Sequence, residues 1–500
     1  MTSLTRGDIP PAVERVLAII RSAGGRPMIV GGFVRDAILR PGAPGKDVDI
    51  EVYGQVDMER LPYALAEAGL HVNLVGMSFS VLTVRAGAIS MDIAPPRLDS
   101  KTGAGHRGFT VVPDGTLSYA EASARREYTV SALMADPDTG QVIDCHGGIA
   151  DLRAGILRHT SAAFSEDPLR VLRGVQFAAR FGFRMDPATA ALCRQLTGKF
   201  AELATERVWG EIQKIGVLGT DITAALTVLA DTGWEEHFPQ IAALHGIRQD
   251  RGWHPEGDVW VHSGLAAGQA ARLADEAGLA GADRLVVVMA ALLHDLGKVT
   301  HTQRDGAWWR LLHAATRNPR WRITCHGHAE AGVEPARAFL RAAGCPEALA
   351  DRVTPLVREH MNCIGRPTKP AVRRLARRLA DGDHDPGGHA HGGPPGARRD
   401  GPATMTELAL VIGADNAGRG NPDAPNPALA WLEVARTLTV TERPPKGLLT
   451  GYHLIAAGMP PGPAFKPVLA AALAAQDAGE FDDEAGAVAW LVRTTQGDNA

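Results

Sequence analysis

Two carboxylates one residue apart, Asp47 and Asp49, follow shortly after a glycine pair, Gly31 and Gly32. The pair comes directly after the apolar run 28–30 and precedes a predicted helix. Glycine gives the backbone the freedom to wrap its N–H groups around a phosphate, and a helix N-terminus favours the same anion. Carboxylates at alternate strand positions share a face, roughly 6.5–7 Å apart, and can hold or flank Mg²⁺. These residues predict metal-dependent chemistry on a nucleoside triphosphate.

The strand that carries the carboxylates is predicted from strict alternation over residues 47–53, with Asp47, Asp49, Glu51 and Tyr53 on one face. Either motif alone is common and needs no function, since a Gly-Gly pair makes turns and acidic strand faces often just meet water. Their combination in one strand–loop–helix–strand unit favours a site.

Two further side chains can join this site. Arg35, on the predicted helix, offers a fork of donors to phosphate. Asp92 is a candidate third carboxylate near the metals, and a solvated strand end is an equally good interpretation.

The elements that must position this site form a mixed α/β head, with a helix over 9–22 and strands over 27–30, 47–53, 80–85 and 89–94. Four parts are expected: the head (1–150), a helical part (151–240), a second helical block (241–445) and a C-terminal helical segment (446–500). Residues 381–402 are rich in Gly, Pro and His, and we interpret them as a disordered insertion.

A second set of chemical residues lies in the second helical block. The strongly apolar stretch 284–293 ends in His294 and Asp295, and an aspartate at a helix C-terminus opposes the helix dipole, so Asp295 needs a cation nearby. Imidazole and carboxylate together suit Mn, Fe, Co, Ni or Zn. His294 and Asp295 are therefore candidate ligands of a divalent transition metal.

Bulk properties limit the classes of partner. The net charge of −4 provides no overall positive field, so contacts to nucleic acid must use local patches. The run Arg373, Arg374, Arg377 and Arg378 is better explained as the solvated side of an amphipathic helix than as a phosphate contact. Five scattered cysteines without a CxxC pair indicate a reducing cytoplasm, and no apolar run reaches about 18 residues, so we expect a cytoplasmic protein without a membrane span.

The motifs now resemble a known family. Residues 31–36 (GGFVRD) with 47–49 (DVD), then 125–132 (RREYTVSA) and 166–173 (EDPLRVLR), are similar in type and order to class II tRNA nucleotidyltransferases (CCA-adding enzymes) and bacterial poly(A) polymerases. The resemblance implies an α+β protein with a polymerase-β-like nucleotidyltransferase head and an all-α, RNA-binding neck and body (151–240). It implies transfer of C and A nucleotides from CTP and ATP to the 3′ end of tRNA, or another RNA, with Mg²⁺ in the head.

The resemblance also implies roles for single residues. Asp47 and Asp49 would be catalytic metal ligands, and the nucleotide would contact Gly31, Gly32, Arg35, Arg126, Asp167, Arg170 and Arg173. Asp167 would accept from the amino group of C or A while Arg170 donates, and a mismatched base would leave buried polar groups unpaired. An alternative for Asp167-Pro168 alone is a helix N-cap and first-turn pair.

Two positions depart from the family pattern. Glu127 stands where the family has Asp, a position associated with ribose recognition, and Ser131 stands where it has Asn. A displacement of about 1 Å can cost roughly 100-fold in rate, so these changes bear on sugar selection and activity.

The order His262, His294-Asp295, Asp415 resembles HD-domain phosphohydrolases and implies an all-α HD domain in 241–445. The resemblance implies that these four residues hold a divalent transition metal. It places His328 and His360 as ligands of a possible second metal, at even odds against a packing role. Our preferred interpretation is a CCA-adding nucleotidyltransferase with an appended HD phosphohydrolase. The alternatives are an HD phosphohydrolase with a weakened RNA-binding head, and a poly(A) polymerase. The shared motifs do not separate addition of CCA, of A alone or of poly(A).

Overall fold

The computed structural model describes residues 4, 6–42, 45–73, 81–101, 109–305, 322–363, 365–381 and 403–497. The chain forms two compact units, residues 1–211 with 224–237, and residues 212–223 with 238–500. The division crosses helix α8 (Thr205–Leu218). It is coarser than the four expected parts, whose boundaries stay predictions, and the insertion expected at 381–402 lies, from residue 382 onward, outside the described residues.

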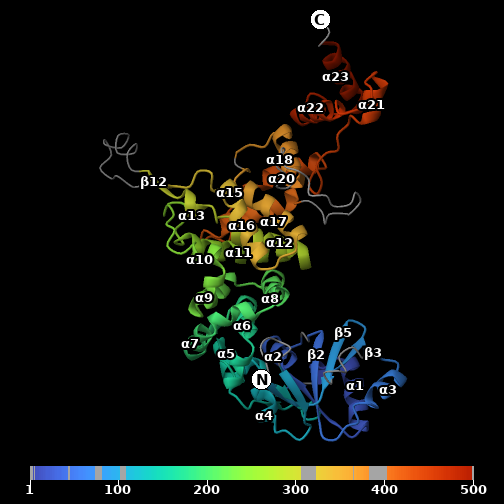
Figure 1. Ribbon diagram of the computed structural model, residues 1–500, viewed down its shortest axis with the longest axis vertical. Helices are drawn as coiled ribbons and strands as arrows, with labels where there is room; N and C mark the ends of the chain where they lie inside the picture. The colour runs from blue at the N-terminus through green and yellow to red at the C-terminus, as the bar shows by residue number, and fades with distance from the viewer. Residues whose placement is uncertain are drawn as a thin grey trace. The chain divides into compact units, whose positions relative to one another are not determined.

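The head is built on a mixed seven-stranded sheet (Figure 1). Its strands in spatial order are β3 (His71–Asn73), β4 (Leu82–Ala86), β5 (Ile89–Ala94), β2 (Asp47–Tyr53), β1 (Arg26–Val30), β8 (Met134–Ala135) and β9 (Val142–Ile143). Strand β2 is central, antiparallel to β1 and parallel to β5. The sequence therefore located β1, β2 and β5 to within a residue, and β4 to within two residues at its start.

Short helices and a hairpin complete the head. The helices are α1 (Pro11–Ser22), α2 (Gly32–Leu39), α3 (Leu61–Glu67), α4 (Tyr119–Ala124) and α5 (Gly148–Ala154), and the hairpin is β6 (Arg97–Lys101) with β7 (Phe109–Pro113). Single-turn helices are η1 (Arg6–Asp8) and η3 (Thr129–Ser131). Helix α1 buries Val13, Val16, Leu17 and Ile20, the apolar stripe that predicted it.

The first unit continues as helices with little sheet. They are η4 (Ala162–Glu166), α6 (Leu169–Phe181), α7 (Pro187–Gln195), η5 (Thr197–Glu202), the start of α8, α9 (Ile222–Asp231) and η6 (Trp234–His237), with one parallel pair, β10 (Ile156–Leu157) and β11 (Arg184–Met185). Tyr128, Phe164 and Trp234 are among the largest fully buried side chains. Tyr128 donates to the carbonyl of Arg170 and so fixes the first turn of α6.

The second unit is a helical bundle. Its elements up to α20 are α10 (Pro239–Ala242), α11 (Val259–Glu276), α12 (Gly281–Leu293), α13 (Lys298–His301), β12 (Gln303–Asp305), β13 (Arg322–Thr324), α15 (His328–Ala331), α16 (Val333–Ala342), α17 (Glu347–Glu359), α18 (Lys369–Asp381), α19 (Met405–Ala417) and α20 (Leu429–Thr437). Helix α12 is buried from Arg284 to Leu293 because α11, α17 and α19 all pack against it. Among the described residues, no helix is long and apolar enough to cross a membrane.

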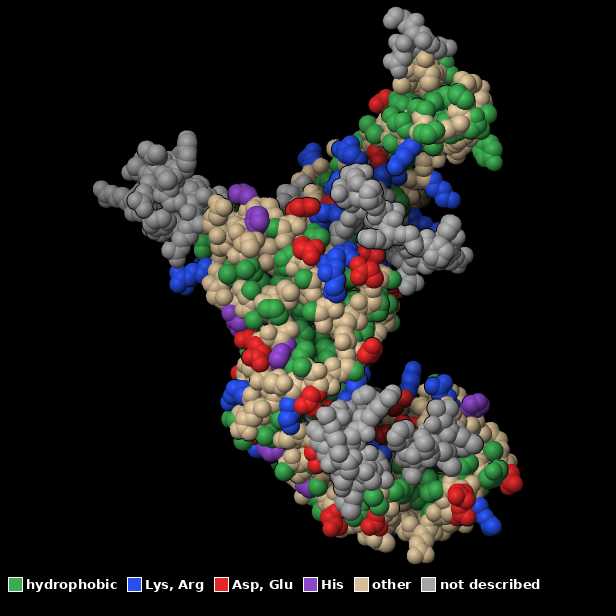
Figure 2. All heavy atoms as spheres, in the orientation of Figure 1, with side chains coloured by type: hydrophobic (Ala, Val, Ile, Leu, Met, Phe, Trp, Pro, Cys, Tyr) green, Lys and Arg blue, Asp and Glu red, His purple; other side chains and the backbone are tan. Residues whose placement is uncertain are grey.

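The C-terminal segment has a small core of its own. Its helices are α21 (Gly451–Ala456), α22 (Phe465–Ala478) and α23 (Glu484–Gly497), with Leu454, Phe481 and Leu491 inside. Figure 2 shows hydrophobic side chains gathered on the drawn surface of this segment.

The arginine run expected to face water does so only in part. Arg377 binds Asp477 with two hydrogen bonds, and Arg373 binds the carbonyl of Gln476 and Asp482. The prediction of a solvated face was wrong for these two residues, since they join α18 to the end of α22.

The sheet of the head, the helices that follow it and the helical bundle confirm the expected fold class. The chain is an α+β protein with a head, a helical body and a helical HD domain.

Candidate active sites in the head and in the helical bundle

The glycine turn in the head has no room for a side chain. Gly31 caps α2 with φ of 73°, a conformation that favours glycine. A Cβ atom there would lie 2.6 Å from Nη1 of Arg126 and 3.4 Å from Oδ2 of Asp49. The turn, Arg126 and Asp49 therefore meet at one point, as the sequence predicted for a phosphate and metal site.

Three carboxylates line the adjacent strands. Asp49 on β2 is paired in register with Asp92 on β5, and neighbouring strands lie about 4.8 Å apart. Asp47, Asp49 and Asp92 are all exposed. Even so, the surrounding protein disfavours charge on Asp49: burial raises its pKa, Asp92 and Glu51 add to this, and Arg126 opposes it. A divalent cation would relieve this repulsion.

Only the first half of the polar face of β2 reaches solvent. Glu51 is 3% exposed and accepts hydrogen bonds from Arg125 and Arg126, at 3.1 and 3.0 Å. The hydroxyl of Tyr53 donates to the other oxygen of Glu51 at 3.1 Å. Glu51 thus anchors Arg126 beside the glycine turn and does not extend the metal site.

Arg35 has a different position from the one expected. Its guanidinium is buried, contacts Asp36 at 2.7 Å and Ser131 Oγ at 3.4 Å, and lies over the rings of Phe177 and Phe181. Burial lowers its pKa, and Asp36 opposes that shift. This geometry supports a role in joining α2 to α6 more than direct contact with a triphosphate.

Asp167, one of the two expected base-reading residues, is held by both carboxylate oxygens. Oδ1 accepts from the backbone N–H of Leu169 at 3.1 Å, and Oδ2 accepts from Arg207 on α8 at 2.8 Å. Pro168, not Asp167, is the residue that caps α6, so the simple cap interpretation is incomplete. Sequence reasoning missed Arg207, because no local motif links it to a residue 40 positions earlier.

Arg170, the other expected base reader, donates to two backbone carbonyls. Nη1 reaches the carbonyl of Ala163 at 2.7 Å, and Nη2 reaches that of Arg125 at 2.8 Å. These bonds fix the guanidinium in the same region as the Arg125-Arg126 pair. Both residues predicted to read the base are therefore held in place by other groups of the protein.

Glu127, the departure from the family pattern, pairs with Arg173 at 2.8 Å. Burial alone would raise the pKa of Glu127, but the combined attraction of Arg173, Arg126 and Arg170, with a backbone hydrogen bond, holds it below its usual value. The longer side chain thus stays ionised and tied to α6. Ser131, the second departure, is buried and contacts Arg35.

In the helical bundle, residues from three helices meet at one buried point. Nε2 of His262, on α11, lies 3.3 Å from Nε2 of His294, at the end of α12, and 3.1 Å from Oδ1 of Asp415, on α19. Oδ2 of Asp295 lies 3.2 Å from Nε2 of His294. All four side chains predicted as ligands are brought together and are at most 9% exposed.

The two further histidines lie on the other side of Asp295. Nε2 of His328 is 3.1 Å from Nε2 of His360, and Oδ1 of Asp295 lies 3.2 and 4.0 Å from these two atoms. One oxygen of Asp295 therefore faces each histidine pair. A bridging carboxylate between two sets of imidazoles is the arrangement that two neighbouring cations require.

The outer nitrogens of these rings are also fixed. Nδ1 of His294, His328 and His360 lies 2.6–2.7 Å from the carbonyl three residues earlier. Nδ1 of His262 approaches Oε1 of Glu256 at 2.7 Å. Acceptors at Nδ1 select the tautomer whose Nε2 lone pair points inward, which is how proteins orient metal ligands.

Asp295 shows the chemistry of a metal ligand. Burial would raise its pKa, but His294 and Lys298 hold the pKa well below its usual value, and Lys298 Nζ lies 2.6 Å away. Neither of its buried oxygens has a hydrogen bond of ordinary geometry among the described residues. Among those residues, the triplets of possible ligands within 4.8 Å of one another all lie in this bundle, none in the head.

Gly297 follows the end of α12 and has a helical φ of −69°. A Cβ there would lie 2.0 Å from the carbonyl oxygen of His328. The glycine is needed because α15 packs directly on this backbone, which brings His328 to Asp295. Sequence reasoning also gave no role to Glu256, Lys298 or Arg419, although Arg419 binds Asp415 at 3.0 Å.

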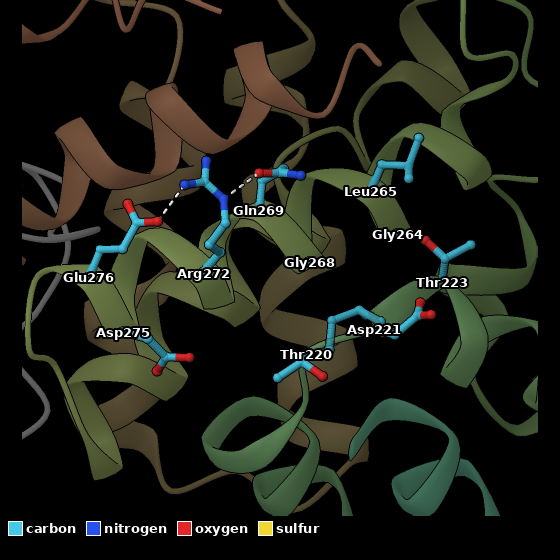
Figure 3. A pocket seen from close by; sticks show the side chains of 11 residues that line it. Thr220, Asp221, Thr223, Gly264, Leu265, Gly268, Gln269, Arg272, Asp275 and Glu276 are labelled. Atoms are coloured by element: carbon cyan, nitrogen blue, oxygen red, sulfur yellow. Dashed lines mark hydrogen bonds and ion pairs between the residues drawn. The ribbon is translucent and has the colours of Figure 1, made fainter. Parts of the chain in front are cut away.

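A pocket of about 490 Å³ lies on another stretch of α11, away from the histidine cluster (Figure 3). Arg272, at its rim, bonds to Gln269 and Glu276, and Thr220, Asp221 and Asp275 add oxygen atoms. Gln269 and Glu276 thus satisfy Arg272, and the pocket contains none of the predicted site residues.

Family models match three stretches of the chain: the Poly A polymerase head domain (residues 27–158), the "Probable RNA and SrmB- binding site of polymerase A" (182–244) and the HD domain (259–384). The Multifunctional CCA protein of Xanthomonas campestris is 35% identical over 410 residues, covering 80% of this chain and 87% of that protein. The Multifunctional CCA protein of Xylella fastidiosa is 33% identical, with 80% and 86% covered.

Solved structures give the same fold. The CCA-adding enzyme of Bacillus stearothermophilus in complex with CTP has a TM-score of 0.60 at 22% identity, covering 98% of this chain and all of that one. The fold and the two sites thus define a nucleotidyltransferase that carries an HD domain. The chain belongs to the multifunctional CCA protein family of tRNA 3′-end nucleotidyltransferases.

Proposed function

We propose that this enzyme adds C and A nucleotides from CTP and ATP to the 3′ end of tRNA. The observation that carries the proposal is the meeting of Gly31, Arg126 and Asp49 at one point, with Asp92 in register on the neighbouring strand. The curated relatives are called Multifunctional CCA proteins, and proteins of the same fold have been solved with CTP, with ATP and with tRNA.

Asp47 and Asp49 are the proposed Mg²⁺ ligands, with Asp92 beside them. Hard carboxylate oxygens suit this ion, and because burial, with Asp92 and Glu51, raises the pKa of Asp49, a cation beside this carboxylate would be favourable. Bound Mg²⁺ would activate the 3′-hydroxyl of the RNA and neutralise the leaving pyrophosphate. The glycine turn and Arg126 would receive the triphosphate.

Base choice is proposed to reside in Asp167 and Arg170. An ionised carboxylate accepts from the exocyclic amino group of C or A and repels the carbonyl that U or G presents there. Arg207 holds Asp167 in this acceptor role, and backbone carbonyls hold Arg170. A fixed pair discriminates better than a mobile one, because a wrong base cannot be accommodated by rotation.

The test is incubation of the purified chain with tRNA lacking its terminal A, CA or CCA and each labelled nucleotide. We expect C and A to be added until CCA is complete, with little use of UTP or GTP. A long A tract on any RNA would identify a poly(A) polymerase. Binding of tRNA without nucleotide addition under Mg²⁺ would favour the alternative of a weakened, RNA-binding head. That alternative is considered because Glu127 and Ser131 depart from the family pattern.

The helical bundle is proposed to hydrolyse a phosphate ester, such as a 2′,3′-cyclic or terminal phosphate. His262, His294, Asp295 and Asp415 would hold one divalent transition metal, and His328 and His360 with Asp295 a second. The buried, inward Nε2 atoms fit such an ion. The metal would lower the pKa of a bound water and make it a nucleophile. Metal analysis of the full chain, with hydrolysis assays under Mn, Co, Ni and Zn, tests this assignment.

A further inference from the structure

The segment between α10 and α11 lies directly beside the histidine cluster. Gln249, which is 5% exposed, accepts a hydrogen bond from Lys298, the partner of Asp295. Seven residues later, Glu256 contacts both His254 and His262. The segment is therefore anchored to the cluster at two points, through Lys298 and through His262. Residues 250–255, between these two contacts, are held at the edge of the cluster.

Between the two anchors a tight turn exposes an aromatic side chain. The backbone N–H groups of Trp253 and His254 donate to the carbonyl of Asp250, and its carboxylate accepts from Gly252. Trp253 is 62% exposed. The next residue, His254, points inward, with its ring centroid 4.7 Å from that of His262.

A single exposed hydrophobic residue usually needs no explanation. Trp253 differs because consecutive Cα atoms are about 3.8 Å apart, so its backbone is one residue from a ring that touches a metal ligand. A rigid turn that directs Trp253 outward and the next residue, His254, inward is a suitable support for a stacking surface.

Positive charge accompanies the aromatic ring. Arg419, a quarter exposed, binds Asp415 and lies close enough to His254 to help lower the pKa of that imidazole, a shift caused mainly by burial. Arg248 and Arg251, in the same segment as Trp253, are exposed. An aromatic platform with guanidinium groups nearby is the general means of binding a base and its phosphate.

We propose that Trp253 is a base-stacking platform of the HD centre: the base of a nucleoside phosphate ester would lie on Trp253 while its phosphate faces Arg419 and the histidine cluster. The proposal rests on the proposed phosphohydrolase function and assigns to it a residue that determines specificity. Phosphate esters without a base would reach the cluster but would not be held by the turn.

The test compares Trp253→Ala and Trp253→Phe in the full, metal-loaded chain carrying Asp49→Ala, which removes nucleotide addition. We expect KM for adenosine 2′,3′-cyclic phosphate to rise about tenfold or more in Trp253→Ala and to recover in Trp253→Phe, since stacking on one aromatic residue has this magnitude. Hydrolysis of p-nitrophenyl phosphate and the metal content should not change. Tyr452→Ala, which removes another exposed aromatic (85%), is the matched control.

A second readout is independent of turnover. Fluorescence of 2-aminopurine riboside 2′-monophosphate should be quenched on binding to the parent chain and to Trp253→Phe, and less in Trp253→Ala. Equal KM values and equal quenching in Trp253→Ala would overturn the platform while leaving the hydrolase intact. Hydrolysis of p-nitrophenyl phosphate alone would also overturn it, and absence of any hydrolysis would remove both the platform and the proposed function.

Discussion

The two sites of this chain differ in how complete they are before any ligand binds. In the head, Asp47, Asp49 and Asp92 are exposed along two strands and form no tight cluster with other described ligands. In the helical bundle, His262, His294 and their partners converge within hydrogen-bond distance and are buried.

This difference reflects what each site must do. The reaction proposed for the head, with CTP and ATP at an RNA 3′ end, calls for an open surface that metal and triphosphate complete together. A hydrolytic centre can hold its metal permanently, because burial and fixed tautomers place the ligands in advance. The predictions below test whether the open and the preformed site are independent.

The largest effect is expected from a substitution that inactivates the head alone. Asp49→Ala should lower nucleotide addition about a thousandfold or more, since loss of a metal ligand removes several kcal/mol of transition-state stabilisation. Phosphate-ester hydrolysis should stay at the parent rate, because the sites share no proposed ligand. Labelled CTP incorporation and hydrolysis are measured on one preparation, with Asp57→Ala as the exposed-carboxylate control. Unchanged addition would show that β2 is not the catalytic strand.

The converse substitution inactivates the site in the helical bundle alone. His294→Ala should remove bound transition metal and hydrolysis, and nucleotide addition under Mg²⁺ should persist. Metal content by elemental analysis checks it, and His326→Ala is the control, since His326 is exposed and outside the clusters of possible ligands. If His294→Ala retained its metal, the buried cluster would be a structural hydrogen-bond network.

A smaller effect is expected at the base-reading pair. Arg207→Ala frees one oxygen of Asp167, and a lost charge-assisted hydrogen bond of about 1.5–3 kcal/mol corresponds to roughly tenfold to a hundredfold in selectivity. Use of UTP and GTP relative to CTP and ATP should rise by up to that factor. Arg153→Ala, at an exposed arginine of the same unit, should leave selectivity unchanged. Parental selectivity in Arg207→Ala would show that Asp167 is oriented without it.

Sequence reasoning succeeded where chemistry depends on spacing. Alternation located β2 and its carboxylates, and the His–Asp pattern led to the four predicted ligands that converge in the bundle. It gave no indication of contacts with distant partners, such as those of Glu256, Lys298 and Arg419 in the same cluster. The contacts of Arg35 with two rings on α6 were not foreseen either, and Arg377 was predicted to be solvated although it binds Asp477.

Arg207 shows the same limit, because its role depends on its hydrogen bond to Asp167, 40 residues earlier in the chain. No periodicity or motif encodes such a contact. The packing of the helices decides it.

The smallest expected effect concerns Glu127, where the open site is tied to the helical body. The pKa of Glu127 is lowered in the folded chain, mainly by Arg173 against the opposing effect of burial, so its pairing stabilises the fold above the ordinary glutamate pKa of about 4.3. This contribution is lost as pH falls through the lowered folded value. Because Arg173 is 41% exposed, screening limits the gain to about 1 kcal/mol.

Glu127→Gln should therefore unfold at lower urea than the parent chain at pH 7, and the gap should narrow below pH 4. Tryptophan fluorescence during urea titration measures both. An equal gap at both pH values would mean that side-chain shape, not charge, joins Glu127 to α6. Glu127→Asp then separates stability from sugar selection. If the shorter carboxylate no longer reaches Arg173, this variant should also unfold at lower urea. A changed preference between ribo- and deoxyribonucleotides would place Glu127 at the nucleotide as well.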